Sequence, residues 1–235
     1  MVQHLTDRLL KIASLVPKNT YLADIGTDHA HLPIYLIENG ITNSCIAADI
    51  VDGPLEMARK NISAHGFEDK IRVVKSNGLD KVYPFTPETV VIAGMGGETI
   101  RDIISACDFS KDGAPLFILQ PMTHTELLRE YLIKNGFSIL NEDVVREAHR
   151  FYVIMVVKYL EKQEFYFDAG LGEIYEIGGI LADTEDKRDY LIWRREICQR
   201  NAASLSKSIG ATEKIQAINN LISEIDRRLS DGKIK

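Results

Sequence analysis

The stretch from Leu22 to Ala30, Leu-Ala-Asp-Ile-Gly-Thr-Asp-His-Ala, has the pattern of a nucleotide-cofactor loop. A short apolar run ends in Asp24 and Gly26 and passes directly into a predicted helix, as at the carboxyl edge of a parallel sheet. Pyrophosphate needs several glycines for close approach of the backbone, and this loop has one. The pattern therefore disfavours NAD and FAD. It favours S-adenosylmethionine, which needs only a tight turn and a carboxylate, and so indicates methyl transfer.

Four further segments end predicted strands with residues that suit a ligand. Asp49 can accept hydrogen bonds from two ribose hydroxyls, or it can cap the next helix. The Asn-Gly pair at 77–78 can flank an adenine ring, or form only a turn. The Gly-Met-Gly-Gly run at 94–97 indicates either close approach of a ligand to the backbone or a tight strand-to-helix crossing. The Gln-Pro-Met run at 120–122 can line a base pocket, or simply end its strand.

A doubly wound sheet would bring these loops together. Apolar runs predict strands near 21–25, 44–50, 71–76, 89–93 and 116–119, with helices between them. Two more strands, near 137–145 and 150–159, have only a short link, so one of them must run antiparallel. The expected fold class is α/β, a class I Rossmann-like methyltransferase with a mostly parallel seven-stranded sheet.

The C-terminal part of the chain has a different pattern. After a join that contains glycines, residues 184–209 predict one long helix and residues 212–229 a second, each with a narrow apolar stripe. Such a pair is typical of a C-terminal α-helical coiled-coil hairpin. We therefore expect two domains, a methyltransferase domain at 1–165 and a helical coiled-coil domain at 166–235.

Charge is distributed unevenly along the chain. The formal net charge is −6, which taken alone argues against a nucleic-acid partner. Residues 184–235, however, carry 11 Lys and Arg against 8 Asp and Glu, so the tail is mildly basic. Trp193 and the arginines at 188, 194, 195 and 200 can stack on and pair with RNA, or they can form an ordinary solvated face.

Composition limits where the protein works. No apolar stretch approaches the roughly 18 residues that a membrane helix requires. The N-terminus lacks the apolar core of a signal peptide, and the three cysteines form no CxxC pair. These features predict a cytoplasmic protein without a membrane partner. The histidines have no metal-ligand spacing, so we expect no metal, and the oligomeric state is left open.

Taken together, the motifs resemble those of the TrmK family, bacterial tRNA methyltransferases that modify N1 of the adenine at nucleotide 22. The resemblance spans essentially the whole chain. It rests on Asp-Ile-Gly-Thr-Asp-His-Ala-His-Leu-Pro at 24–33, Ala-Gly-Met-Gly-Gly-Glu at 93–98 and Leu-Gln-Pro-Met at 119–122. One departure is His31, where the family pattern has Tyr. The resemblance implies S-adenosylmethionine as methyl donor and tRNA as substrate.

The resemblance also implies two sets of site residues. The cofactor-binding candidates are Asp24, Gly26, Thr27, Asp28, Asp49, Ile50, Asn77, Gly78, Gly94 and Met95. The candidates for substrate binding and catalysis are Asp28, His29, Met95, Gln120 and Arg8.

Chemistry is consistent with N1 as the acceptor. Neutral adenine N1 has an exposed lone pair and no proton to lose, so no dedicated base is required. Enzymes that methylate an exocyclic amine typically have an Asp/Asn-Pro-Pro-aromatic motif after the fourth strand. This chain has Gly-Met-Gly-Gly at that place. Methylation of carbon 5 of a pyrimidine would need a nucleophilic cysteine in the site. Neither Cys45 nor Cys107 lies at the carboxyl end of a predicted strand, so neither suits that role. Two alternatives stay open: a methyltransferase for a small molecule or protein, and a non-catalytic S-adenosylmethionine-binding RNA scaffold.

Overall fold

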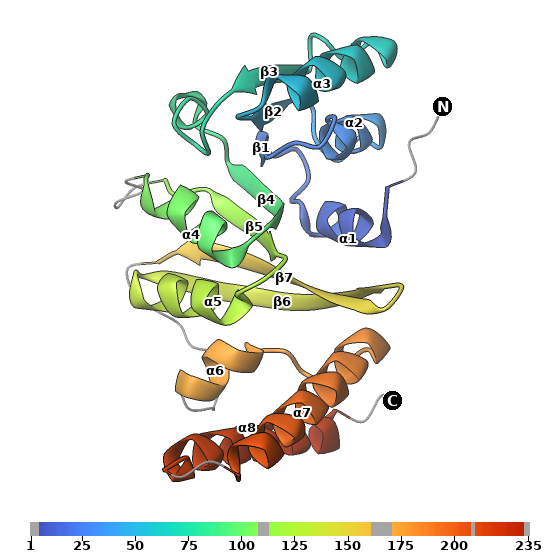
Figure 1. Cartoon of the computed structure of the whole chain (residues 1–235). Coiled ribbons are helices and arrows are strands. Elements are labelled where there is room, and N and C mark those ends of the chain that lie inside the picture. The colour runs from blue at the N-terminus through green and yellow to red at the C-terminus, as the bar shows by residue number, and fades with distance from the viewer. Residues whose placement is uncertain (1–4, 108–112, 161–170, 208–209, 233–235) are drawn as a thin grey trace.

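One sheet forms the centre of the molecule (Figure 1). The structure, a computed structural model, describes residues 5–107, 113–160, 171–207 and 210–232. Its seven strands lie in the order β3-β2-β1-β4-β5-β7-β6. The strands are β1 Leu22–Ile25, β2 Cys45–Asp49, β3 Ile71–Lys75, β4 Thr89–Met95, β5 Leu116–Pro121, β6 Phe137–Glu147 and β7 Arg150–Tyr159. The five strands β3, β2, β1, β4 and β5 pair in parallel. β7 runs antiparallel to both of its neighbours, β5 and β6, which confirms the predicted sheet.

Five helices cover the two faces of this sheet. On one face lie α1 Asp7–Leu15, α2 His31–Glu38 and α3 Asp52–Ala64, and on the other lie α4 Gly97–Ser105 and α5 Thr125–Lys134. Successive strand residues point to opposite faces, so Leu22 packs on the first side and Ala23 on the second. Strands β1, β2, β4 and β5 are buried on both faces, which explains their continuous apolar runs. This winding brings the carboxyl ends of β1 to β5 to one edge.

The C-terminal helices cover strand β6, which forms one edge of the sheet. They are α6 Leu171–Ile177, α7 Glu185–Leu205 and α8 Thr212–Asp231. Figure 1 shows α6 between the sheet and the pair formed by α7 and α8. The apolar stripes correctly predict that the two long helices pack together, whereas coiled-coil geometry stays a prediction. Helix α6 was not predicted, because the glycines around it indicate a connecting loop.

Two details of the predicted tail fall outside the described residues. The boundary between residues 165 and 166 lies within 161–170, so the division into two domains stays a prediction. Ile209, the predicted end of the first long helix, also lies outside, and α7 ends at Leu205. Within the described part, one hydrophobic core runs from the sheet into the helices, because Ile174 and Leu191 pack in the same cluster as Phe117.

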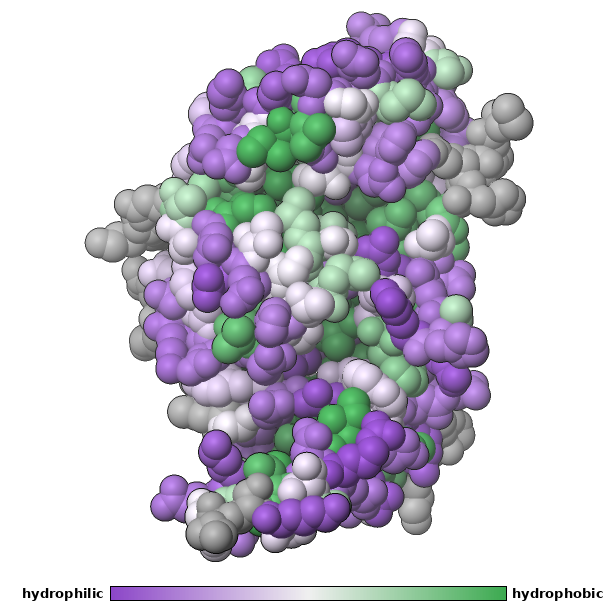
Figure 2. All heavy atoms as spheres, in the orientation of Figure 1, coloured by the Kyte–Doolittle hydropathy of each residue, from purple (hydrophilic) through white to green (hydrophobic). Residues whose placement is uncertain are grey.

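The surface facing the viewer is mostly hydrophilic, and its apolar patches are small and separate (Figure 2). None of the described helices is long and apolar enough to cross a membrane.

Candidate active site

The end of β1 contains a buried carboxyl group. Asp24 exposes only 7% of its surface, and among the described residues no Lys or Arg pairs with it. Burial raises the pKa of Asp24 to about 6; Thr27 opposes the shift, while Asp28 and Asp49 add to it. Gly26 turns the chain at φ +73°, and its N–H donates to the Ala48 carbonyl at 2.8 Å. A buried carboxyl without a basic partner is typical of a functional position.

The loop between β1 and α2 holds two consecutive left-handed residues. His29 has φ +58° and Ala30 has φ +60°, a conformation that is costly for residues with a Cβ. Asn61 of α3 stabilises it by donating its side-chain amide to the His29 carbonyl at 3.0 Å. The His29 Nε2 lies 3.2 Å from the exposed Asp28 carboxylate. Strain of this kind is usually retained where it positions functional groups.

The end of β2 combines a carboxylate with exposed apolar side chains. Asp49 Oδ1 accepts a hydrogen bond from the Val51 N–H at 2.8 Å, which holds the turn before α3. No described side chain caps the N-terminus of α3, so Asp49 does not cap this helix. Binding of the ribose hydroxyls of a cofactor would use the other carboxylate oxygen of Asp49, Oδ2. The next residue, Ile50, is 56% exposed, so an apolar surface lies beside this carboxylate. Such a surface suits a flat purine ring.

The turn after β3 is organised by Ser76. Its hydroxyl donates to the Gly78 carbonyl at 2.9 Å and accepts from the Lys81 N–H at 3.0 Å. Gly78 has φ +56°, and an added Cβ would lie 3.0 Å from Ile103 of α4. These contacts explain the Asn-Gly pair as a turn. The Asn77 side chain is exposed, and its role toward an adenine stays a prediction.

The glycine run at the end of β4 has two different explanations. Gly94 has φ +79° and lies at an irregularity of the β4–β5 pairing, where its N–H donates to the Gln120 side chain. Gly97, in contrast, is buried against backbone, because an added Cβ would lie 2.8 Å from the Thr123 carbonyl and closer still to that of His124. The tight-crossing interpretation therefore holds for Gly97, and ligand approach remains an interpretation for Gly94. Met95 fills the space beside Gly26, which joins the β1 and β4 loops.

Gln120 links the end of β5 to the N-terminal helix. It is completely buried, and its Oε1 accepts from the Gly94 N–H at 3.1 Å and from Arg8 Nη1 at 2.5 Å. Its Nε2 donates to the Pro121 carbonyl at 2.8 Å. The Arg8 guanidinium also lies over the Tyr152 ring, 5.5 Å from its centre. Since its own amide is engaged on both sides, Gln120 acts by holding Arg8 and the β4 backbone.

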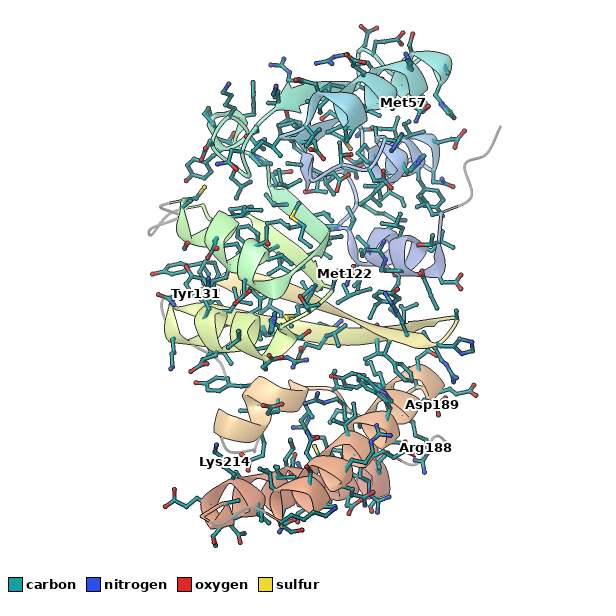
Figure 3. All side chains as sticks on the ribbon, viewed as in Figure 1. Met57, Met122, Tyr131, Arg188, Asp189 and Lys214 are labelled. Atoms are coloured by element: carbon teal, nitrogen blue, oxygen red, sulfur yellow. The ribbon has the colours of Figure 1, made fainter. Side chains whose placement is uncertain are left out.

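The structure thus brings the candidates together in two groups. One joins the β1, β2 and β4 loops through Asp24, Gly26 and Met95, and the other joins Arg8, Gly94 and Gln120. Met122, two residues after Gln120 in the chain, lies near the centre of the molecule in Figure 3. In the described part of the chain, no three His, Cys, Asp or Glu side chains gather as a metal site would require.

Three positioning residues were missed by sequence reasoning. They are Asn61, which holds the His29 carbonyl, Glu147, which accepts from the Arg8 backbone N–H at 2.5 Å, and Tyr152 beneath Arg8. Asn61 lies 32 positions from His29, and Glu147 lies 139 from Arg8. No local pattern marks such pairs, because they meet only when the sheet forms.

Three of the four arginines for which the sequence left RNA contact or a solvated face open hold the helices together. Arg188 donates to the Leu229 carbonyl, Arg194 pairs with Glu176 at 2.6 Å, and Arg195 pairs with Asp226 at 2.9 Å. Trp193 packs against Phe151 of the sheet. This packing favours a structural role over RNA contact for the three arginines. Arg188 lies with Asp189 below the tip of the β6–β7 hairpin (Figure 3).

The strand order, the crossovers and the loops at the carboxyl edge define a class I methyltransferase. Residues 5–155 match the family model described as a methyltransferase domain. A tRNA (adenine(22)-N(1))-methyltransferase of Bacillus subtilis is 30% identical over 193 residues, which cover 82% of this chain and 81% of that protein. The chain belongs to this family of tRNA methyltransferases, the TrmK family.

Solved structures extend the similarity to nearly the whole chain. A Streptococcus pneumoniae structure in complex with S-adenosyl-L-methionine is 31% identical, with a TM-score of 0.74 over 96% of this chain and 100% of that chain. Mycoplasma capricolum TrmK, solved with S-adenosyl-homocysteine, is 25% identical, with a TM-score of 0.77 over 97% of this chain and 99% of that chain. The C-terminal helices are therefore part of the shared architecture.

Proposed function

We propose that this protein transfers a methyl group from S-adenosylmethionine to N1 of the adenine at nucleotide 22 of tRNA. The observation that carries the proposal is family membership over most of the chain, with the family's motifs at the ends of β1, β4 and β5. Within the chain, residues 1–165 would hold cofactor and acceptor base, and residues 166–235 would contact the rest of the tRNA. Because the substrate is tRNA, the cytoplasm is the expected location.

The residues at the carboxyl edge fit the cofactor. The cofactor carries a cationic sulfonium, and Asp24 offers a buried carboxyl group without a basic partner among the described residues. Asp49 Oδ2 would accept from the ribose hydroxyls, and the exposed Ile50 side chain would lie against the adenine ring. The left-handed turns at Gly26 and Gly94 carry no Cβ, so Met95 lies against the first and Arg8 against the second. When bound, the cofactor supplies a methyl group on a sulfur that leaves as a neutral thioether.

The acceptor side of the reaction is assigned to Arg8, Gln120 and the Asp28–His29 pair. Arg8 Nη1 lies beside Gly94, held in place by Gln120 and by the Tyr152 ring. A fixed guanidinium there would orient the acceptor nucleotide through its phosphate or base. His29 is oriented by Asp28 and would complete the base pocket. These roles follow from position and stay proposals.

The reaction places few chemical demands on these residues. The lone pair of adenine N1 forms the new N–C bond as the S–C bond breaks, and no proton has to leave first. Positioning and electrostatics therefore supply most of the rate. N1 lies on the Watson–Crick edge, so the base must be unpaired or flipped out to react.

Transfer of tritium from labelled cofactor to an unmodified tRNA transcript tests the proposal. We expect label on N1 of the adenine at nucleotide 22, and none after that adenine is replaced by guanine. Binding of tRNA should weaken steeply as salt rises, because phosphate contacts release counterions. Label at another base would contradict the assigned position. Label on small molecules or proteins alone, or no transfer despite cofactor binding, would support the alternatives.

Replacing Gln120 by Leu should lower kcat about 10- to 100-fold and change cofactor affinity less than about threefold. The reason is that leucine fills the space but leaves Arg8 Nη1 and the Gly94 N–H without their acceptor, a loss of about 1.5–3 kcal/mol. Single-turnover methylation and calorimetry with the cofactor would measure the two effects. Gln120→Glu keeps the acceptor oxygen and should retain more activity than the leucine variant. Equal loss in both variants would argue against the acceptor role.

A further inference from the structure

A completely buried ion pair connects the sheet to the C-terminal helices. Arg129 of α5 and Glu142 of β6 both have fully buried side chains, and Arg129 Nε lies 2.8 Å from Glu142 Oε1. Burial alone would lower the pKa of Arg129, but the Glu142 carboxylate and Tyr190 raise it, so the guanidinium stays charged. This pair does not belong to the carboxyl-edge site, which lies at other strands.

Both partners of the pair continue into the turn that follows α6. Arg129 Nη1 donates to the Tyr175 carbonyl at 3.0 Å and to the Glu176 carbonyl at 3.1 Å. Glu142 Oε2 accepts from the Gly179 N–H at 2.5 Å. The preceding residue, Gly178, has φ +59°, and a Cβ there would overlap the Glu142 carboxylate. The end of α6 is therefore bound to the sheet by directional hydrogen bonds.

Helix α8 binds the same turn from the other side. Arg228 is 2% exposed, and its Nη1 donates to the Gly178 carbonyl at 2.7 Å and to the Ile180 carbonyl at 3.0 Å. Its Nε donates to Glu224 at 2.7 Å. One short turn thus connects the buried pair of the sheet to the helix that pairs with α7. Figure 1 shows this turn between β6 and the two long helices.

A second attachment lies farther along β6, toward the hairpin tip. Asp143 pairs with Lys11 of α1 at 2.5 Å and lies 3.7 Å from Lys187 of α7. Arg146 pairs with Asp189 at 2.9 Å. Two attachment points along one edge strand define the direction of α7 and α8 relative to the sheet. Apolar packing is non-directional and would allow the helices to slide or rotate.

Buried ion pairs add little net stability compared with apolar residues, and their best-attested role is to select one arrangement. We propose that Arg129 and Glu142 are positioning residues that set the angle of the C-terminal helices on the sheet, and thereby which nucleotide of a bound tRNA reaches the methyl donor. This inference rests on the proposed function, because it assumes that the helices contact tRNA. The basic excess of residues 184–235 supports that contact.

The test replaces the pair by apolar residues, which preserves packing and removes the directional bonds. We expect Arg129→Met/Glu142→Leu to bind the cofactor within twofold of wild type. Its kcat/KM for tRNA should fall at least tenfold, and methylation should appear at adenines other than nucleotide 22, mapped by reverse-transcription stops. The matched control is Lys134→Met/Glu130→Leu, which removes an exposed pair from the same helix and should behave as wild type. Faithful methylation by the double variant, with kcat/KM within twofold of wild type, would overturn the inference.

A second measurement does not depend on tRNA. Spin labels at Lys60→Cys of α3 and Asn219→Cys of α8, both exposed positions, measure the distance between these helices, which changes when the C-terminal helices turn on the sheet. Cys107→Ser removes the partly exposed natural cysteine, and the other two cysteines are buried. We expect a narrow distance distribution in the otherwise wild-type protein and the control, and a broad or shifted one without the buried pair. Identical distributions would overturn the inference. If wild type itself left tRNA unmethylated, the proposed function would fail, while these distances would still test the orienting role.

Discussion

Asp24→Asn is expected to stabilise the cofactor-free protein at pH 7.5 while weakening its affinity for S-adenosylmethionine about 10- to 100-fold. The pKa of Asp24 is raised from 3.8 to about 6, so the folded protein binds this proton more tightly than the unfolded chain does. The stabilisation from that proton is full below about pH 4 and is lost as the pH rises through about 6. Asparagine is neutral throughout, so it removes a cost of about 3 kcal/mol at pH 7.5.

The loss of affinity has a separate physical reason. A buried carboxylate attracts a cationic ligand strongly, and its amide does not. In wild type, affinity should therefore fall as the pH drops below about 6, whereas the variant should show little pH dependence. Thermal unfolding and calorimetry across pH 5–8 would measure both. Asp69→Asn removes an exposed carboxylate and serves as the control. An Asp24→Asn variant that binds the cofactor normally would exclude Asp24 from the site.

The second large effect concerns the buried pair at the base of the C-terminal helices. Arg129→Met should lower the free energy of unfolding by about 3–5 kcal/mol, because it leaves the Glu142 carboxylate buried without its counter-charge. The carbonyls of Tyr175 and Glu176 lose their donor as well. Urea denaturation would measure the change. This value exceeds the effect expected for any exposed pair of the chain.

The double variant separates the charge from the packing. Arg129→Met/Glu142→Leu should recover most of the lost stability, since an apolar pair of similar size fills the same space. Lys134→Met should change the free energy of unfolding by less than about 0.5 kcal/mol, because its pair with Glu130 is exposed. Equal stability of Arg129→Met and wild type would show that Glu142 is solvated or protonated when Arg129 is absent.

The local patterns of the sequence determined the elements and the main loops of the site. Apolar runs and turn residues predict every strand of the sheet, because the pattern of each strand is set within a few residues. The signal is strongest for β1, β2, β4 and β5, which are buried on both faces. The carboxyl-edge rule then places Asp24, Asp49 and Gly94 together without any knowledge of contacts. Helix α6 was missed because its flanking glycines mark turns, and its apolar residues become a core only against the sheet.

What only the tertiary structure decided is which partner each buried group has. Gly97 is a glycine because the Thr123 and His124 backbone lies against it, a fact that a run of glycines alone cannot distinguish from ligand approach. Gln120 holds Arg8, and Arg129 meets Glu142 and the turn after α6. These contacts depend on side chains that the fold brings together from distant segments. Periodicity and propensity are local properties, so the sequence by itself specifies the elements and leaves such long-range pairs to the packed structure.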